Sequence, residues 1–247
     1  MTALAVFAAG SLRAPLSDIG RQFEQDESGV CLRFVFGASG LLKDRLAAGE
    51  AADVFASANM AHPQSLATAG RAGPVQRFTC NRLCLLARPE AGVTAENALD
   101  RLLDPALRVA TSTPLSDPSG DYTWELFRRI GGRGAAFAGA YDLLDRKALK
   151  LTGGPASPPP PAGRSVYAAL LEGGQADVFI TYRSNALQAQ QEVPALQCVD
   201  LPDDVNVWAD YGVVLLDGAG PRARRFVDRL LGPAGQAAFA RRGFSPR

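Results

Sequence analysis

The chain has 247 residues, with 26 Lys and Arg against 25 Asp and Glu, so its formal net charge at pH 7 is +1. This balance argues against a nucleic-acid binder with a basic face and against a polybasic membrane-surface protein. A single histidine, His62, and four cysteines argue against dense metal sites and histidine-based catalysis. The composition predicts a soluble α/β protein whose function does not rest on titrating side chains.

Strand and helix patterns alternate along almost the whole chain, which predicts βαβ units and mainly parallel sheets. The predicted strands are residues 4–9, 30–37, 53–58, 78–87, 108–112, 177–182, 196–201 and 211–217. The predicted helices are residues 12–26, 41–48, 61–69, 94–103, 122–130, 135–147, 165–172, 184–191, 221–231 and 234–242. The segment Thr152–Gly163 interrupts the alternation, and its four consecutive prolines predict a polyproline II surface loop.

The first ten residues are small and apolar, as in the core of a signal peptide. No Lys or Arg precedes them, and the run is short, so we expect a first strand there. If the protein is exported, its signal has been removed from this chain. No apolar run approaches the roughly 18 residues that cross a bilayer.

The four cysteines lie in apolar, strand-like runs: Cys31, Cys80, Cys84 and Cys198. Buried free thiols are the simplest interpretation, while one or two disulfides would fit an oxidising compartment. Cys80 and Cys84 are four residues apart in one predicted strand, which suits neither a disulfide nor a zinc knuckle.

Two segments of the chain repeat each other at an offset of 124 residues. Leu46–Phe55 reads LAAGEAADVF and Leu170–Phe179 reads LLEGGQADVF. The same offset relates Ala38-Ser39-Gly40 to Ala162-Gly163-Arg164, and both triplets open the helix that precedes the repeated segment. A short match of this kind arises by chance, or it indicates two similar α/β lobes.

Small residues stand where four predicted helices begin. These turns are Gly10-Ser11, Ala38-Ser39-Gly40, Asp117-Pro118-Ser119-Gly120 and Gly163-Arg164-Ser165. Helix N-termini carry unpaired N–H groups and a partial positive charge, and serine hydroxyls add donors, so such turns suit a small, fully ionised oxyanion. Each serine taken alone is equally typical of an ordinary helix N-cap.

Several runs of the sequence resemble a known family. The runs VFAAGSL, FGASGLLKDRLAAGEAADVFASA, DPSGDY and ADVFITYRSNA look like the periplasmic molybdate-binding proteins of ABC importers, over nearly the whole chain. The resemblance implies an α/β, type II periplasmic binding protein fold, with two lobes around a cleft, each a mainly parallel sheet flanked by helices. The implied lobes are residues 1–80 for the first part of lobe I, 81–190 for lobe II, and 191–247 for the hinge return and second part of lobe I.

The resemblance also implies the ligand contacts. In that family the oxyanion is held by two serine hydroxyls, by backbone amides, and by one tyrosine hydroxyl from the second lobe. Carried over by motif, the hydroxyls belong to Ser11, Ser39 and Tyr182, and the second-lobe amides lie at Ser119 and Arg164. The implied ligand is molybdate or tungstate, with no cofactor. The implied setting is a periplasmic monomer that serves a membrane permease and binds no nucleic acid.

One departure concerns charge, because Arg164 follows the proline-rich segment and Lys147 and Lys150 lie shortly before it. Extra positive charge near the ligand would admit a different or larger anion, unless these side chains point into solvent. Asp53 and Asp177 begin equivalent strands, and Asp117 precedes a proline, so all three suit turn chemistry. A carboxylate facing the ligand would repel a fully ionised anion, whereas a protonated anion such as hydrogen phosphate needs such an acceptor.

Two other classes of function fit less well. A serine-dependent enzyme needs a base, and the only histidine is poorly placed in the sequence, although a Ser-Lys pair stays open. A ligand-sensing regulator uses the same two-lobed scaffold, but the chain offers neither a DNA-binding segment nor a basic face. The sequence therefore favours an anion-binding transport protein.

Overall fold

The computed structural model describes residues 2–158 and 162–246. The chain forms two compact units: unit 1 comprises Met1–Asn81 with Ala209–Arg247, and unit 2 comprises Arg82–Trp208. The chain passes from unit 1 to unit 2 within strand β4 (Gln76–Ala87) and returns at the start of β9 (Trp208–Leu215). The return lies well beyond the predicted residue 191. The physical reason is that strand β8 (Gln197–Asp200) pairs with β4 and so belongs to unit 2.

Unit 1 contains a four-stranded sheet in the order β2-β1-β3-β9. Its other strands are β1 (Thr2–Ala9), β2 (Val30–Gly37) and β3 (Val54–Ser57). Its helices are the 3-10 turn η1 (Gly10–Leu12), α1 (Arg13–Asp26), α2 (Ser39–Ala47), α3 (Ala61–Thr68), α9 (Pro221–Leu231) and α10 (Pro233–Arg241). Strand β1 runs parallel to β2 and β3, while β9 runs antiparallel to β3.

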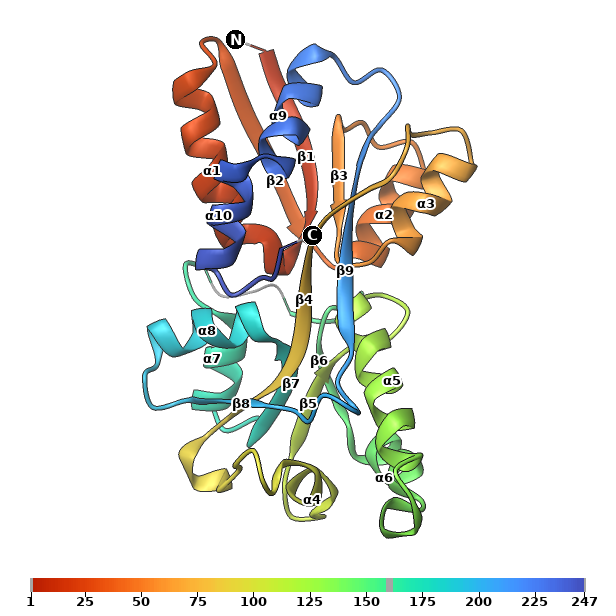
Figure 1. Ribbon diagram of the computed structural model, residues 1–247, viewed down its shortest axis with the longest axis vertical. Coiled ribbons are helices and arrows are strands. Elements are labelled where there is room, and N and C mark those ends of the chain that lie inside the picture. The colour runs from red at the N-terminus through yellow and green to blue at the C-terminus, as the bar shows by residue number, and fades with distance from the viewer. Residues whose placement is uncertain (1, 159–161, 247) are drawn as a thin grey trace. The chain divides into compact units, whose positions relative to one another are not determined.

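Helices cover both faces of this sheet, with α1, α9 and α10 on one side and α2 and α3 on the other (Figure 1). The helical spacing of Leu16, Ile19 and Phe23 gives α1 one apolar face, and all three side chains are buried. Phe23 meets Phe226 of α9 edge to face at a centroid distance of 5.2 Å. The predicted strand and helix over residues 4–26 are therefore confirmed.

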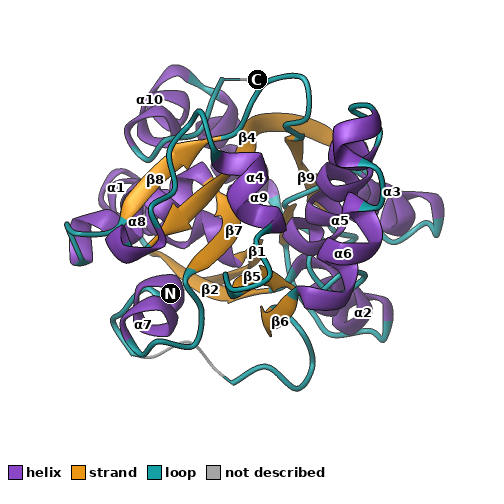
Figure 2. Cartoon of the chain, turned by 90° about the horizontal axis from the view of Figure 1, so that it is seen from below, coloured by secondary structure: helices purple, strands orange, loops and turns teal. Residues whose placement is uncertain are grey.

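Unit 2 contains a five-stranded sheet in the order β8-β4-β7-β5-β6. The remaining strands are β5 (Val109–Ser112), β6 (Leu149–Thr152) and β7 (Val178–Tyr182). The helices are η2 (Pro89–Ala91), α4 (Ala98–Leu103), α5 (Pro118–Gly131), η3 (Ala135–Phe137), α6 (Ala140–Lys147), α7 (Val166–Glu172) and α8 (Arg183–Glu192). Helices α7 and α8 lie on one side of the sheet and α5 and α6 on the other (Figure 2).

The predicted α/β class is correct, but the strand directions in the sheet of unit 2 differ from the mainly parallel arrangement that was expected. Strand β5 is parallel to β6 and β7, but β4 is antiparallel to β7 and β8. The sheet is therefore mixed rather than mainly parallel. Strand β6 was not predicted, because its four residues run directly into the glycines of the proline-rich segment. Part of the predicted polyproline loop, residues 159–161, lies outside the described residues.

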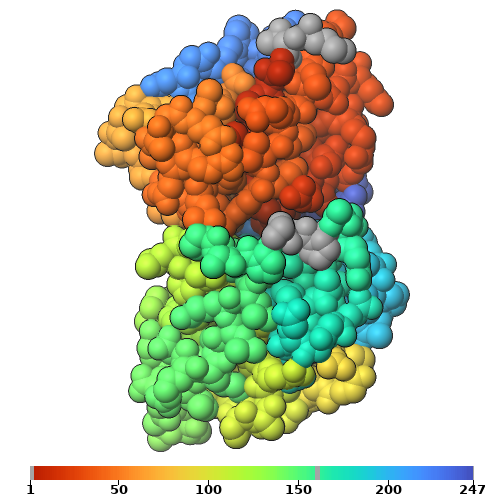
Figure 3. Space-filling view, turned by 180° about the vertical axis from the view of Figure 1, so that it is seen from behind, coloured from red at the N-terminus to blue at the C-terminus, as the bar shows by residue number. Residues whose placement is uncertain are grey.

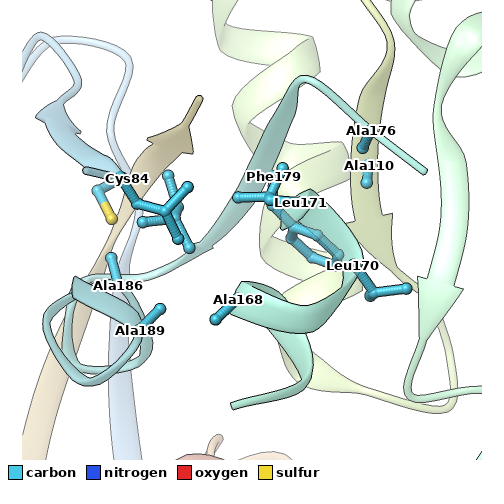
Figure 4. Packing of buried hydrophobic residues seen from close by; sticks show 11 residues of the cluster. Cys84, Ala110, Ala168, Leu170, Leu171, Ala176, Phe179, Ala186 and Ala189 are labelled. Atoms are coloured by element: carbon cyan, nitrogen blue, oxygen red, sulfur yellow. The ribbon is translucent and has the colours of Figure 1, made fainter. Parts of the chain in front are cut away.

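The core of unit 2 is built on the repeated segment. Leu170, Leu171 and Phe179 pack with Ala186 and Ala189 of α8 in one buried cluster, which Figure 4 shows. Helices α5 and α6 form an outer surface of the unit, seen in green in Figure 3. Within residues 2–158 and 162–246, no helix combines the length and apolarity needed to cross a membrane.

Candidate functional site

Ser11 and Ser39 lie at the same edge of the unit 1 sheet. Strands β1 and β2 are parallel and in register, with Ala9 opposite Gly37, where both strands end. Each serine follows its strand's last residue by two positions. The carboxyl ends of parallel strands are the usual place for ligand contacts in α/β folds. The structure therefore brings together the two serines that the motifs singled out.

Ser39 is the first residue of α2 and only 1% exposed. Its Oγ accepts a hydrogen bond from the Ala58 N–H at 3.1 Å. The residue before the helix is Ala38, and no side chain caps it. Ser39 is therefore not an ordinary N-cap, and its hydroxyl proton points to no acceptor among the described residues. That proton is available to an anion.

Ser11 lies in the 3-10 turn that follows β1. Its Oγ is 2.8 Å from the Oη of Tyr211, which is fully buried on β9 of the same unit. Either hydroxyl can donate in this pair, and if Tyr211 donates, Ser11 keeps its own proton for a ligand. Tyr211 was not singled out from the sequence, because the two residues are 200 positions apart and only the folded sheet joins them.

In unit 2, Ser119 lies in the first turn of α5 and is 1% exposed. Its N–H donates to the Oδ1 of Asp117 at 3.1 Å, so Asp117 is the side-chain N-cap of this helix. The Ser119 Oγ has no hydrogen-bond partner among the described residues. The predicted backbone donor is thus already engaged, while the hydroxyl beside it is buried and unsatisfied.

The Asp117 carboxyl has no basic partner among the described residues. Burial raises its pKa to about 6, against the opposing effects of the Ser119 N–H and the Ser112 hydroxyl, and the nearby Asp121 raises it further. Gly153 packs directly on Asp117, because a Cβ there would come within 2.6 Å of the carboxylate. The N-terminus of α5 therefore presents a carboxyl group that is largely ionised at neutral pH.

Tyr182 is the last residue of β7 and is 2% exposed. Its ring meets that of Tyr122 on α5 at a centroid distance of 6.5 Å. Strands β5 and β7 are parallel, so their carboxyl ends share one edge, and α5 follows β5. The structure therefore brings Tyr182 to the same end of unit 2 as the first turn of α5.

A network of hydroxyls and one amide extends from Asp117 into unit 2. Ser112 Oγ lies 3.0 Å from Thr152 Oγ1, and the side-chain amide of Asn185 donates to Thr181 and to the Tyr167 hydroxyl, each at 3.0 Å. Burial raises the pKa of Tyr167, and the neighbouring Asp117 adds to this rise. None of these residues is among the contacts that the resemblance implied.

The three basic residues do not form a free basic cluster, which corrects the idea of extra positive charge at the ligand. Arg164 pairs with Glu172 and Glu192, and Glu192 also accepts the N–H of Ser165 at 2.7 Å. These interactions direct the Arg164 side chain to carboxylates of its own unit.

The two lysines are also engaged, each in a different place. The Lys147 ammonium donates to the carbonyls of Leu102, at 2.9 Å, and Asp104, at the end of α4. The Lys150 ammonium lies 5.2 Å from the ring centroid of Trp124.

Asp53 and Asp177 serve structure, but through contacts with distant segments rather than through the local turns that were predicted. Asp53 accepts the N–H of Ala5 at 2.8 Å. Asp177 accepts the N–H of Arg108 at 2.9 Å and pairs with its guanidinium, which lowers the pKa of Asp177. Across the part of the chain that the structure describes, no three His, Cys, Asp or Glu side chains gather into a metal site.

The fold is the type II fold of the periplasmic binding proteins. The chain belongs to the bacterial extracellular solute-binding protein family, which matches residues 4–245. An uncharacterized protein of Pasteurella multocida is 38% identical over 92% of this chain and 91% of its own. The molybdate-binding protein ModA of Mycobacterium tuberculosis is 31% identical over 98% of this chain and 84% of its own.

Solved structures share the fold at low sequence identity. The sulfate-binding protein SubI of M. tuberculosis matches with a TM-score of 0.81, at 20% identity, over 100% of this chain and 87% of its own. The periplasmic molybdate-binding protein of Azotobacter vinelandii matches with a TM-score of 0.76, at 18% identity, over 99% of both chains. AfuA of Actinobacillus pleuropneumoniae, bound to fructose 6-phosphate, matches with a TM-score of 0.73, at 16% identity, over 100% of this chain and 85% of the AfuA chain.

Proposed function

We propose that the protein binds a tetrahedral oxyanion, molybdate or tungstate, and delivers it to the membrane permease of an ABC importer. The contact residues in this proposal are Ser11, Ser39, Ser119, Arg164 and Tyr182, with Arg164 contributing its backbone. The protein would act as a periplasmic monomer without a cofactor. The family description is that of a binding protein, which favours transport over catalysis.

The observation that carries this proposal is the pair of serines at one edge of the unit 1 sheet. The Ser39 oxygen accepts from a backbone N–H, which leaves its proton for a ligand, and Ser11 also has a proton to give when Tyr211 is the donor of their shared hydrogen bond. A fully deprotonated dianion accepts hydrogen bonds and donates none, so neutral donors suit it. The buried, unpaired hydroxyl of Ser119 supports a further donor, because such groups are rare without a ligand or water.

Titration calorimetry with molybdate, tungstate and sulfate tests the proposal. We expect Ser39→Ala and Tyr182→Phe each to weaken molybdate binding about tenfold, the cost of one lost hydrogen bond to an anion. The matched controls are Ser65→Ala, which removes an exposed hydroxyl, and Tyr141→Phe, and both should bind like the parent. If none of the three anions binds, or if Ser39→Ala and Tyr182→Phe match the parent, the proposal fails.

A second candidate is an oxyanion that carries a proton or a hydroxyl group, such as hydrogen phosphate or a sugar phosphate. It is favoured by Asp117, whose carboxylate already accepts the Ser119 N–H and stands where a dianion would be repelled. A ligand O–H could instead donate to this carboxylate. AfuA, which shares the fold, is described with bound fructose 6-phosphate.

Asp117→Asn separates the two candidates, because asparagine keeps the cap but removes the charge. If the ligand is molybdate, the variant should bind molybdate more tightly than the parent, since a repulsive charge is gone. If the ligand is hydrogen phosphate or fructose 6-phosphate, the parent should bind it and the variant should lose affinity, since an amide is a weaker acceptor than a carboxylate. Asp142→Asn, on the exposed first turn of α6, serves as the charge-matched control.

A further inference from the structure

Two cysteines that are far apart in the sequence face each other in unit 2. Cys84 on β4 and Cys198 on β8 place their sulfur atoms 3.6 Å apart. In the antiparallel register Cys84 lies opposite Asp200 and Leu86 lies opposite Cys198, so the two side chains share one face of the sheet. A disulfide bond is about 2.05 Å long, so the sulfur atoms need to approach by only about 1.5 Å.

The surroundings make the two thiols unequal. Cys84 is fully buried in the cluster of Figure 4, on the side of Ala186 and Ala189. Cys198 is partly exposed and packs against the edge of that cluster. The contact with the Cys84 thiol, and then the charge of Arg183, lower the pKa of Cys198 against the opposing effect of burial. The same contact and burial both raise the pKa of Cys84.

Two arginines fix this environment. Arg82 of β4 and Arg183 of α8 both pair with Asp200, at 2.9 Å and 3.4 Å. Asp200 lies two residues beyond Cys198 on the same strand, so both guanidinium groups lie beside the exposed end of the thiol pair. Thiolates form and react more readily beside arginine. Cys198 is therefore the thiol that meets an oxidant first.

We propose that Cys84 and Cys198 form a disulfide that joins β4 to β8, by exchange with a small-molecule disulfide such as oxidised glutathione. The Cys198 thiolate attacks one sulfur of the oxidant, and the first glutathione thiolate leaves. The Cys84 thiolate then attacks the Cys198 sulfur and displaces the second glutathione. Two protein thiols are oxidised, the glutathione disulfide is reduced, and the two thiol protons pass to the two glutathione molecules.

The geometry selects this pair over the other cysteines. Among the described residues, Cys84 and Cys198 are the only two thiols within hydrogen-bond distance of each other. Cys31 is exposed on β2, and the Cys80 thiol contacts the carbonyls of Ser245 and Pro246. Strand β8 is a short strand paired with β4, so the bond would fasten it to the rest of the sheet. This proposal does not rest on which anion the protein binds.

The test uses the full chain carrying Cys31→Ser, which removes the exposed thiol. The folded protein is incubated with oxidised glutathione, then alkylated in denaturant and mapped by mass spectrometry. We expect the Cys84 and Cys198 thiols to be lost together and one cross-linked peptide pair to appear. Cys80 should remain a free thiol during oxidation and should therefore be alkylated. Hydrogen exchange at residues 197–200 should slow on oxidation and recover with a reductant.

Two variants in the same background test the order of the steps. Cys84→Ala should retain glutathione on Cys198, because no second thiol displaces it, and Cys198→Ala should leave Cys84 unmodified. Should either variant unfold, which circular dichroism reveals, the mapping of the Cys31→Ser protein still decides the matter. Three results for the Cys31→Ser protein would overturn the proposal. They are the survival of all three remaining thiols, a cross-link that involves Cys80, and a Cys198 that keeps its glutathione while no cross-link to Cys84 forms.

Discussion

Replacing Asp117 by asparagine should stabilise the protein at neutral pH. The Asp117 carboxyl caps α5 but has no cation beside it among the described residues, and burial raises its pKa from 3.8 to about 6. One pKa unit corresponds to about 1.36 kcal/mol, so ionised Asp117 costs the folded state about 3 kcal/mol relative to the unfolded chain. Asparagine is an equally good N-cap and keeps the acceptor for the Ser119 N–H.

The sign of the pH dependence follows from the raised pKa. Between pH 3.8 and about 6 the folded protein holds a proton that the unfolded chain has lost, so stability falls as the pH rises through this window. Above pH 6 both states are ionised, and the full cost remains. The asparagine variant lacks this dependence. It should be more stable than the parent by up to about 3 kcal/mol at pH 7.5, and the two proteins should converge near pH 4.

Urea unfolding of both proteins across this pH range measures the difference directly. Asp142→Asn, at an exposed position in the first turn of α6, controls for the loss of one negative charge and should show no such pH-dependent gain. A stability difference that is the same at every pH, or a variant less stable than the parent at pH 7.5, would refute the reasoning about burial.

Three further predictions concern the core and the sheet. Phe23→Ala removes a buried ring between α1 and α9 and should lower the free energy of unfolding by about 3–5 kcal/mol in urea titrations. Gly120→Ala places a Cβ within 2.5 Å of the backbone and should cost at least about 2 kcal/mol, whereas Gly131→Ala, with 3.5 Å contacts, should cost less in the same titrations. Oxidation of Cys84 and Cys198 should raise the free energy of unfolding by at most roughly 4.7 kcal/mol, the value for a ~100-residue loop. Thermal melts should show a higher melting temperature that a reductant reverses.

The local parts of the fold and site were accessible from sequence. Ser11 and Ser39 stand in strand-turn-helix segments whose apolar periodicity and small residues signal their own ends, so the two turns were predicted correctly. Their meeting at one edge follows from parallel pairing, which the alternation of strands and helices implies. Tyr182 is proposed only from the resemblance of its motif, because nothing in a lone tyrosine at a strand end indicates a role.

The non-local parts were not accessible. Strand β8 joins unit 2 because it pairs with β4, more than a hundred residues earlier, and no local signal marks that partner. The pairing of Ser11 with Tyr211, and of Arg164 with Glu192, likewise depends on segments brought together only by folding. Arg164 illustrates the difference, because its charge is visible in the sequence but the two carboxylates that engage it are not.

The two units therefore offer an anion different chemistry. Unit 1 presents the Ser39 hydroxyl, whose oxygen accepts from the Ala58 N–H and whose proton is left to donate, and the Ser11 hydroxyl, which can donate when Tyr211 donates to it. In unit 2 two carboxylates occupy backbone amides at helix starts: Asp117 takes that of Ser119, and Glu192 takes that of Ser165. Anion-binding turns usually leave these amides open. A bare dianion suits hydroxyl donors such as that of Ser39, whereas a ligand with a proton to donate suits the ionised carboxylate of Asp117. The affinity of Asp117→Asn for molybdate, compared with its affinity for hydrogen phosphate, therefore tests directly whether the Asp117 carboxylate repels the ligand or accepts a hydrogen bond from it.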